Sequence, residues 1–210
     1  YLDNNFRDMM KKIAILGSTG SIGKTTFDIL KKNKRNIKIV LLTTNKNIKE
    51  ILNQQEIFNV QNLIITDKKK FNVIKKISKH QNFKVYNNYE CFKKIFKTKV
   101  DYVMASITGI NGLEPTLKII KFTKKIAIAN KESIVCAWNL VSKELKKNKT
   151  EFIPVDSEHF SIWETLKGFK INNVEKIYIT ASGGPLLNLP MKKIKKITKK
   201  ETLKHPNWSM

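Results

Sequence analysis

Cysteine, arginine and long apolar runs are scarce in this chain of 210 residues. Cys91 and Cys136 stand far apart and lack the spacing of a metal site, which excludes a disulfide framework and favours reduced thiols. No apolar run approaches the ~18 residues that a membrane span needs, and the first residues lack the basic start and apolar middle of a signal peptide. We therefore expect a globular protein in the cytoplasm, with no membrane partner.

The sequence is short of arginine although it is strongly basic, with a formal net charge of +24. Such a charge usually indicates nucleic-acid binding. Yet only Arg7 and Arg35 are arginine, and the lysines are scattered over every polar stretch, whereas base and phosphate recognition favours clustered arginine. We therefore expect no nucleic-acid partner, and we expect the positive field to draw in small anionic ligands.

Strand and helix patterns alternate along the chain, and 41% of the residues are hydrophobic, which is enough for a substantial core. We expect strands at residues 10–16, 37–42, 62–66, around 85, 102–106, 125–129, 152–155 and 177–181. We expect helices at residues 21–32, 48–58, 71–79, 89–96, 113–122, 134–147, 159–166 and 191–200. Regular βα alternation with short loops predicts an α/β fold, a Rossmann-type parallel sheet with helices on both faces.

A glycine-rich turn, Gly17-Ser18-Thr19-Gly20-Ser21-Ile22-Gly23, joins the first predicted strand to the first helix. Glycines let the backbone approach a phosphate closely, and amides at the start of a helix face the anion. The spacing is a variant of the dinucleotide-binding fingerprint. Two alternatives stay open. Gly23-Lys24-Thr25 could end the P-loop of a nucleoside triphosphatase, although Gly17 falls one residue early, or the turn could bind nothing.

The end of the second predicted strand lacks the acid that holds the ribose hydroxyls in an NAD site. The residues Thr43-Thr44-Asn45-Lys46-Asn47 stand there instead. Because a lysine flanked by amides suits a 2′-phosphate, Lys46 favours NADPH over NADH. The alternative is that Lys46 is one more surface lysine.

In parallel sheets, ligands bind beyond the carboxyl ends of the strands. Residues 108–112 and Asn130-Lys131-Glu132-Ser133 directly follow two of these ends. The amide, lysine and acid of the second set can reach the ribose and nicotinamide of a cofactor. The alternative for Asn130 is a helix cap, with Glu132 in the first helical turn, and both interpretations remain open.

Two acids follow the strand predicted at residues 152–155. If the chain stays extended through Asp156-Ser157-Glu158, both carboxylates lie on the same side, where a divalent cation relieves their repulsion. Such hard oxygen donors suit Mg²⁺ or Mn²⁺. The alternative is a helix N-cap formed by Asp156 or Ser157, with Glu158 favourable in the first turn.

Five motifs occur in a fixed order, and together they resemble one family from about Lys11 onward. They are GSTGSIG at residues 17–23, ANKES at 129–133, PVDSEH at 154–159, SGGP at 182–185 and HPNWSM at 205–210. The chain resembles the 1-deoxy-D-xylulose 5-phosphate reductoisomerases. The resemblance implies an NADPH-binding Rossmann-type domain at residues 1–150 and the first, incomplete part of an α/β catalytic domain at 151–210. The family continues into further segments, so we expect a C-terminally truncated fragment.

The resemblance also implies roles for individual residues. The pyrophosphate of NADPH would lie against Gly17, Thr19, Gly20, Ser21 and Ile22. Its 2′-phosphate side would contact Lys46 and Asn47, and its nicotinamide half Asn130 and Glu132. The metal ligands would be Asp156 and Glu158. The substrate would contact Lys131, Ser157, Glu158, Ser182, His205 and Trp208, with Trp208 and Met210 in a flexible flap. The catalytic residues would be Lys131, Asp156, Glu158 and His205.

In this family a Mg²⁺ or Mn²⁺ ion chelates the ketone and hydroxyl of the sugar phosphate while its skeleton rearranges, and NADPH then reduces the resulting aldehyde. The product is 2-C-methyl-D-erythritol 4-phosphate, a precursor in non-mevalonate isoprenoid biosynthesis. We expect a homodimer at full length and little activity from this chain alone. A non-catalytic NADPH-binding remnant is the remaining alternative, beside the P-loop protein.

Overall fold

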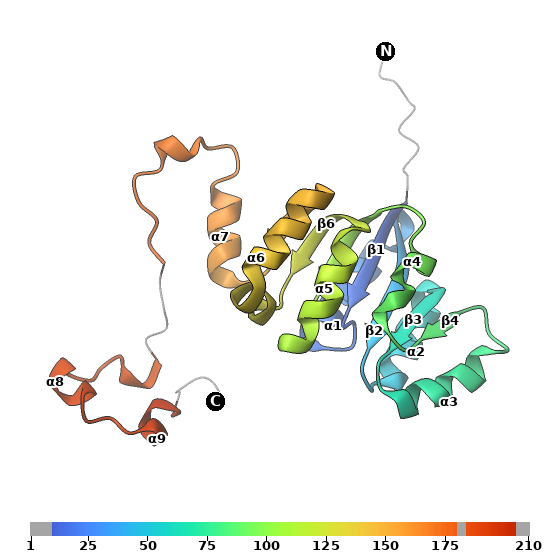
Figure 1. The fold of residues 1–210 in the computed structure, drawn as a ribbon, viewed down its shortest axis with the longest axis horizontal. Helices are drawn as coiled ribbons and strands as arrows, with labels where there is room; N and C mark the ends of the chain where they lie inside the picture. The colour runs from blue at the N-terminus through green and yellow to red at the C-terminus, as the bar shows by residue number, and fades with distance from the viewer. Residues whose placement is uncertain (1–9, 180–183, 205–210) are drawn as a thin grey trace, which may run out of the picture. The chain divides into compact units, whose positions relative to one another are not determined.

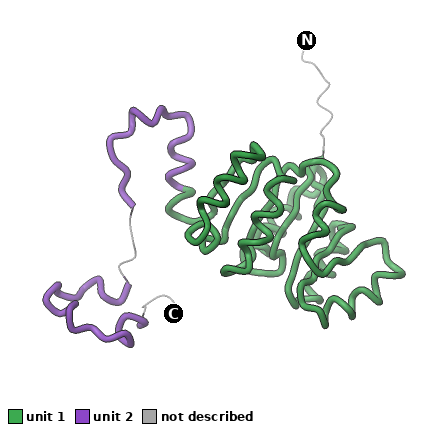
Figure 2. Tube along the Cα trace, in the orientation of Figure 1, with its two compact units in different colours: residues 1–160 green, residues 161–210 purple. Residues whose placement is uncertain are grey.

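The computed structural model describes residues 10–179 and 184–204. The chain forms two compact units, Tyr1–Phe160 and Ser161–Met210, which Figure 2 shows in different colours. We call them unit 1 and unit 2. In the described ranges, no helix combines the length and the apolar character that crossing a bilayer requires.

Unit 1 is built on a seven-stranded sheet with the order β4-β3-β2-β1-β5-β6-β7 (Figure 1). Its strands are β1 Lys11–Leu16, β2 Ile37–Thr44, β3 Asn62–Ile65, β4 Lys84–Tyr86, β5 Val100–Ala105, β6 Thr123–Ile128 and β7 Glu151–Pro154. Every neighbouring pair is parallel. The predicted parallel sheet is therefore confirmed. β7 lies beyond residue 150 and pairs with β6, and the division into domains at 1–150 and 151–210 stays a prediction.

Helices cover both faces of the sheet, as predicted. They are α1 Ser21–Lys32, α2 Ile48–Phe58, α3 Lys68–Ser78, α4 Phe92–Ile95, α5 Leu113–Ile120 and α6 Lys131–Asn148, with short 3₁₀ turns η1 Lys34–Asn36, η2 Tyr89–Cys91 and η3 Ile110–Gly112. Phe27, Ile51 and Ile74 of α1, α2 and α3 are buried against one face. Phe92, Ile119 and Leu145 of α4, α5 and α6 are buried against the other, where α5 and α6 lie in front of the sheet in Figure 1.

The sheet has a topological switch point between β1 and β5. From β1 the chain proceeds outward through β2 and β3 to β4, and it then returns to the other side of β1 to form β5. The connections after β1 and β5 therefore run in opposite directions and leave a crevice at the carboxyl ends of these strands. Residues that follow β1 and β5 are thus the first place to look for a ligand.

The predicted elements of unit 2 are partly wrong. The predicted helix 191–200 is two short helices, α8 Met191–Ile194 and α9 Lys199–Thr202, because Thr198 and Glu201 form a capping box that starts a new helix. Of the predicted strand 177–181, residues 177–179 pair with no strand in the described chain, and the rest lies outside it. The remaining elements are α7 Ser157–Thr165, which crosses the boundary between the units, η4 Ile171–Asn173 and η5 Gly184–Leu186.

Candidate functional site

The glycine-rich turn after β1 has the geometry of a dinucleotide-binding turn. Gly17 has a φ of +79°, a left-handed conformation that favours glycine. A Cβ atom there would lie 3.0 Å from the backbone of Ser106 and Ile107, beyond β5. A Cβ atom at Gly23 in α1 would lie closer than 3.0 Å to the backbone of Gly17 and Ser18. The first glycine therefore permits the tight turn, and the last permits α1 to pack against it.

The end of β2 and helix α2 hold this turn in place. The Gly17 N–H donates to the Thr43 hydroxyl at 2.8 Å, and the Ser18 N–H donates to the Thr43 carbonyl at 2.9 Å. From α2, the buried Gln54 side chain donates through Nε2 to the Ser18 carbonyl at 3.0 Å. These bonds therefore fix the turn from two sides, through β2 and through α2.

The start of α1 is suited to an anion. Its N-cap is Gly20, which provides no side-chain cap, and the first turn of the helix holds no acid. The backbone amides at Ser21 and Ile22 therefore begin a helix whose positive dipole end has neither a side-chain cap nor an acid in its own first turn. This is the arrangement that binds phosphate groups at helix N-termini.

Lys24 does not take the position that a P-loop requires. Its ammonium group lies 3.5 Å from a carboxylate oxygen of Glu50 on α2. A P-loop lysine instead reaches toward the nucleotide phosphates. Together with the close packing at Gly23, this ion pair favours the dinucleotide interpretation over the P-loop.

Two neighbouring cavities occupy the carboxyl edge of the sheet. The larger has a volume of about 660 Å³ and is lined by the glycine-rich turn, the ends of β2 and β3, and the residues after β4 and β5. The smaller has a volume of about 290 Å³ and is lined by Ile22 and by residues after β5, β6 and β7. Ser106, Ile107 and Thr108 line both. The two cavities therefore share one wall, and we refer to them together as the cleft.

Lys46 and Asn47 lie at the β2 side of the cleft without lining the larger cavity. Thr44 and Asn45 line it instead, because β2 continues two residues beyond its predicted end at 42. Asn47 is the N-cap of α2, and its side chain accepts a hydrogen bond from the Glu50 N–H at 3.2 Å. Lys46 is exposed. The contact of both residues with a 2′-phosphate stays a prediction.

The far wall of the larger cavity holds residues that the sequence patterns did not single out. They include Asn88 and Tyr89, which follow β4, and Glu114 at the start of α5. Burial raises the pKa of Tyr89 to about 12, and the nearby Glu114 carboxylate adds to the shift. The phenol is therefore a neutral hydrogen-bonding group at physiological pH. The rule that ligands lie beyond the carboxyl ends of strands would have found these residues if it had been applied to β4.

Asn130 is the N-cap of α6. The side chain is 2% exposed, and its Oδ1 accepts a hydrogen bond from the Ser133 N–H at 2.7 Å. Its Nδ2 donates to the carbonyls of Ile107 and Gly109. All the hydrogen-bonding capacity of its two N–H bonds is thus used within the chain. The cap interpretation describes this side chain, and a contact of Asn130 with a cofactor stays a prediction.

Lys131 and Glu132 differ from Asn130 because both are exposed and line the smaller cavity. They occupy the first turn of α6, immediately beyond the end of β6. Asp156, beyond the end of β7, lines the same cavity. The structure therefore brings together three of the predicted residues from two different strand ends.

The chain does not stay extended through Asp156-Ser157-Glu158, so the condition for placing both carboxylates on the same side is not met, and the alternative of a helix cap at Asp156 is confirmed. β7 ends at Pro154 and α7 begins at Ser157, which places Glu158 in the first turn of a helix. Asp156 caps this helix, because its Oδ1 accepts a hydrogen bond from the His159 N–H at 2.6 Å. The same carboxylate lies 2.9 Å from Nδ1 of the exposed His159 ring.

Asp156 and Glu158 still offer hard oxygen donors, which suit Mg²⁺ or Mn²⁺. No group of three or more His, Cys, Asp or Glu side chains in the described chain is arranged to hold a metal ion. Magnesium commonly takes one or two protein carboxylates and completes its shell with water and substrate oxygens, so the number and type of these donors suit such an ion. Their role as ligands stays a prediction. Of the other predicted site residues, Ser157 begins α7, whereas Ser182, His205, Trp208 and Met210 lie outside the described residues.

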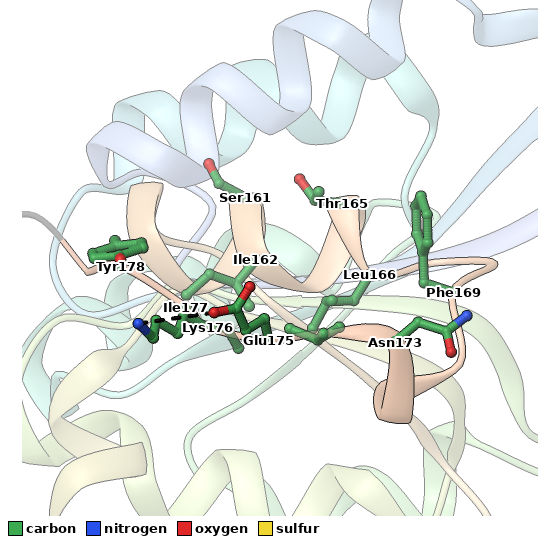
Figure 3. Close-up of a pocket in the computed structure, with 11 residues that line it drawn as sticks. Ser161, Ile162, Thr165, Leu166, Phe169, Asn173, Glu175, Lys176, Ile177 and Tyr178 are labelled. Carbon is green, nitrogen blue, oxygen red and sulfur yellow. Dashed lines mark ion pairs between the residues drawn. The ribbon is translucent and has the colours of Figure 1, made fainter.

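Unit 2 contains a separate cavity of about 610 Å³ between α7 and the segment that follows it (Figure 3). Ile162 of α7 and Leu166, which directly follows the helix, point toward this segment, which includes Ile177. An ion pair of 3.8 Å between Glu175 and Lys176 lies beside them. The sequence patterns did not predict this cavity, and its lining is mainly aliphatic and aromatic.

The sheet order, the glycine-rich turn and the cleft at the switch point define unit 1 as a Rossmann-type unit of the dinucleotide-binding class. Models of two protein families match the chain. One, described as 1-deoxy-D-xylulose 5-phosphate reductoisomerase, matches residues 13–138, and the other, the C-terminal domain of the same enzyme, matches residues 152–210. The chain belongs to the 1-deoxy-D-xylulose 5-phosphate reductoisomerase family.

Curated relatives of the same name support this membership. The protein of Pelagibacter ubique is 59% identical over 203 residues, which cover 96% of this chain and 52% of the relative. The protein of Clostridium tetani is 40% identical over 204 residues, which cover 96% of this chain and 53% of the relative. This chain therefore spans about half the length of the curated relatives that it matches.

Solved structures give the same result. The chain resembles a 1-deoxy-D-xylulose 5-phosphate reductoisomerase from Zymomonas mobilis in complex with NADPH, with 31% identity and a TM-score of 0.78 over 93% of this chain and 52% of that one. It also resembles a DOX-P reductoisomerase in complex with NADPH, fosmidomycin and magnesium, with 30% identity and a TM-score of 0.75 over 95% of this chain and 52% of that one.

Proposed function

We propose that the protein to which this chain belongs catalyses the NADPH- and divalent-metal-dependent conversion of 1-deoxy-D-xylulose 5-phosphate to 2-C-methyl-D-erythritol 4-phosphate. This is an oxidoreductase reaction of non-mevalonate isoprenoid biosynthesis. The observation that carries the proposal is the cleft. It joins the phosphate-binding turn at one end to Lys131, Glu132 and Asp156 at the other. Family membership and the NADPH and magnesium complexes of the similar structures support it.

In this proposal the cofactor lies along the carboxyl edge of the sheet. Its pyrophosphate binds at the turn through Thr19, Gly20, Ser21 and Ile22, because this turn presents free helix amides. Its 2′-phosphate lies on the β2 side, near Lys46 and Asn47. Its nicotinamide lies in the smaller cavity, beside Glu132 and the loop that Asn130 holds.

The sugar phosphate occupies the open side of the smaller cavity. The Lys131 ammonium group there can neutralise an anionic substrate, and Asp156 and Glu158 provide the oxygen donors for a metal ion. When bound, a divalent metal polarises the ketone of the substrate and NADPH supplies a hydride. Ser157, Ser182, His205 and Trp208 complete the substrate contacts in the proposal. We also propose that the metal is Mg²⁺ or Mn²⁺ and that the whole protein is a cytoplasmic homodimer.

The reaction can be tested in a fusion that we call the extended protein. It joins this chain to the residues of the Pelagibacter ubique relative that follow the matched region. NADPH oxidation is followed by absorbance with 1-deoxy-D-xylulose 5-phosphate and Mg²⁺ or Mn²⁺. We expect oxidation that depends on both the sugar phosphate and the metal. If NADPH binds but no sugar-dependent oxidation occurs, the chain is a cofactor-binding remnant instead.

A further inference from the structure

Asn130 lies where three backbone segments of unit 1 meet. These are the end of β6, the start of α6, and the loop of residues 107–112, which follows β5 and which we call the β5 loop. Its Oδ1 accepts from the Ser133 N–H at 2.7 Å, which caps α6. Its Nδ2 donates to the Gly109 carbonyl at 2.6 Å and to the Ile107 carbonyl. One buried amide therefore ties the β5 loop to the helix.

The β5 loop is shaped to receive this amide. Gly112 is buried, and a Cβ atom there would lie closer than 3.0 Å to both the Asn130 amide nitrogen and the Ile107 carbonyl oxygen. Gly109 has a φ of +70°, which favours glycine, and its carbonyl accepts a hydrogen bond from the Gly112 N–H at 3.0 Å. The loop therefore folds back on itself around the Asn130 side chain, and no larger residue fits at position 112 without displacing it.

The same loop is the shared wall of the cleft. Ile107 and Thr108 line both cavities, while Asn111 lines only the larger and Asn130 only the smaller. A change in the position of this loop therefore alters both cavities at once. A side chain that only touched a nicotinamide would alter the smaller cavity alone.

We propose that Asn130 is a positioning residue that fixes the β5 loop between the two cavities and so controls affinity for both halves of the cofactor. The inference rests on the proposed function, since its ligand is the NADPH assigned to the cleft. It assigns a role to the donor side of the amide, which is distinct from capping α6. The two roles use different atoms and can be separated by mutation.

The substitutions Asn130→Ser and Asn130→Asp separate the capping of α6 from the positioning of the β5 loop. Serine and aspartate both cap helices well, so each variant can keep the bond from the Ser133 N–H. Neither carries the amide donor, so the carbonyls of Ile107 and Gly109 lose their hydrogen bonds from residue 130. Gly112→Ala disturbs the same contact from the opposite side. Ser133→Ala is the matched control, because the buried Ser133 hydroxyl has no hydrogen-bond partner among the described residues and its backbone N–H is unchanged.

The experiment measures binding of two probes to the 210-residue chain by calorimetry: NADPH, and 2′-phospho-ADP-ribose, which is NADPH without nicotinamide. We expect Asn130→Ser and Asn130→Asp to weaken both probes by about tenfold or more, because each removes the donor that holds the β5 loop in place. Gly112→Ala should also weaken the binding of both probes, and Ser133→Ala should weaken the binding of neither. Hydrogen exchange should speed up at Gly112 in Asn130→Ser while β6 stays protected.

If the variants lost affinity for NADPH but kept it for 2′-phospho-ADP-ribose, Asn130 would act on the nicotinamide alone, and the inference would be overturned. A lower melting temperature with unchanged affinity for both probes, which is the result expected of a helix cap only, would overturn it as well. Wild-type exchange at Gly112 in a variant that does not bind either probe would contradict the inference as well. Failure of the wild-type chain to bind NADPH is a different result, and it counts against the proposed function.

Discussion

The two units of this chain differ in how they bury their apolar residues. Unit 1 packs a sheet between two helical layers, and residues such as Leu41, Leu63 and Ile126 are fully buried. In the described part of unit 2 no residue is buried, and Tyr178 and Met191 are 82% and 80% exposed. The stability of unit 1 therefore follows from its own hydrophobic core, whereas unit 2 gains little from burial within itself.

This difference predicts which functions each unit can support. The part of the cleft proposed to bind the cofactor is formed by residues that strands and hydrogen bonds hold in place, such as the bonds of Thr43 and Gln54 to the glycine-rich turn. The residues proposed as metal ligands, Asp156 and Glu158, lie at the end of unit 1, and most of those proposed to contact the substrate follow Pro154 in the sequence. We therefore expect cofactor binding to be a property of this chain, and catalysis to require further contacts.

The largest expected effect concerns turnover. The 210-residue chain should convert 1-deoxy-D-xylulose 5-phosphate more slowly than the extended protein by orders of magnitude, because catalysis depends on groups that are held together around the substrate. Steady-state NADPH oxidation under identical conditions measures the ratio. Near-equal rates would show that the residues of this chain suffice for catalysis. The difference in burial between the two units would then have no consequence for function.

The next largest effect is on metal binding in the extended protein. Asp156→Asn keeps the helix cap, since asparagine caps as well as aspartate, but it removes a charged oxygen donor. We expect Mn²⁺ affinity to fall by at least the roughly 10–100-fold seen when even an outer-shell partner of a metal is lost, with little change in melting temperature. Calorimetric titration with Mn²⁺ measures it.

Asp67→Asn is the matched control for this change. Asp67 caps α3 in the same manner, through a bond of 2.9 Å from the Lys70 N–H, and it lies outside the residues that line the cleft. It should leave Mn²⁺ affinity unchanged. If Asp156→Asn behaves like Asp67→Asn, the carboxylate is a cap and not a ligand.

A smaller effect is expected at the 2′-phosphate. Lys46→Ala should weaken NADPH by roughly tenfold, the size expected for losing a hydrogen bond to a charged group, and should leave NADH unchanged. Lys49→Ala is the control, because Lys49 is an exposed lysine in the first turn of α2 that does not line the cleft. Parallel titrations with NADPH and NADH measure the two affinities in each variant. A loss of equal size for NADH and NADPH would assign Lys46 a general electrostatic role.

The smallest effect tests the core of unit 1 through its thiols. Cys136 is exposed, whereas burial raises the pKa of Cys91 from 9.0 to about 12. At pH 8 a thiol reagent should modify Cys136 in the folded chain and Cys91 only after unfolding, and Cys136→Ser identifies the two reactions. Since the folded pKa is raised, the stabilisation linked to the Cys91 thiol is present below pH 9 and is lost as pH rises toward 12. Rapid modification of Cys91 in the native chain would contradict the packing described for α4 and η2.

The sequence predicts unit 1 well where local and long-range signals agree. The predicted ends of α1 and α2 coincide with those observed, because a glycine-rich turn precedes one helix and an asparagine cap precedes the other. β2 continues through Thr43 and Thr44, which are polar and buried, so hydrophobicity alone gave too short a strand. A pattern of apolar positions does not detect buried polar residues that form hydrogen bonds to the glycine-rich turn.

The sequence predicted which residues form the candidate site better than it predicted the local conformation of the chain there. Residues after strand ends were found because the topology of parallel sheets places them together, as Lys131, Glu132 and Asp156 are. The local conformation at Asp156 stayed open in the sequence, which allowed both an extended chain and a helix cap, and the hydrogen bond from the His159 N–H decides in favour of the cap. The role of Gln54 was not found either, because its contact with Ser18 spans elements that only the fold brings together.

The central claim is that the cleft of unit 1 binds NADPH along the carboxyl edge of the sheet. Backbone amide NMR of the 210-residue chain, recorded while NADPH is added, tests this claim most directly. The account predicts saturable shifts at residues 19–22, 44–47, 106–108 and 130–132, while the amides of α3 and of unit 2 stay in place. Shifts confined to unit 2, or no saturable shifts at the glycine-rich turn, would contradict it.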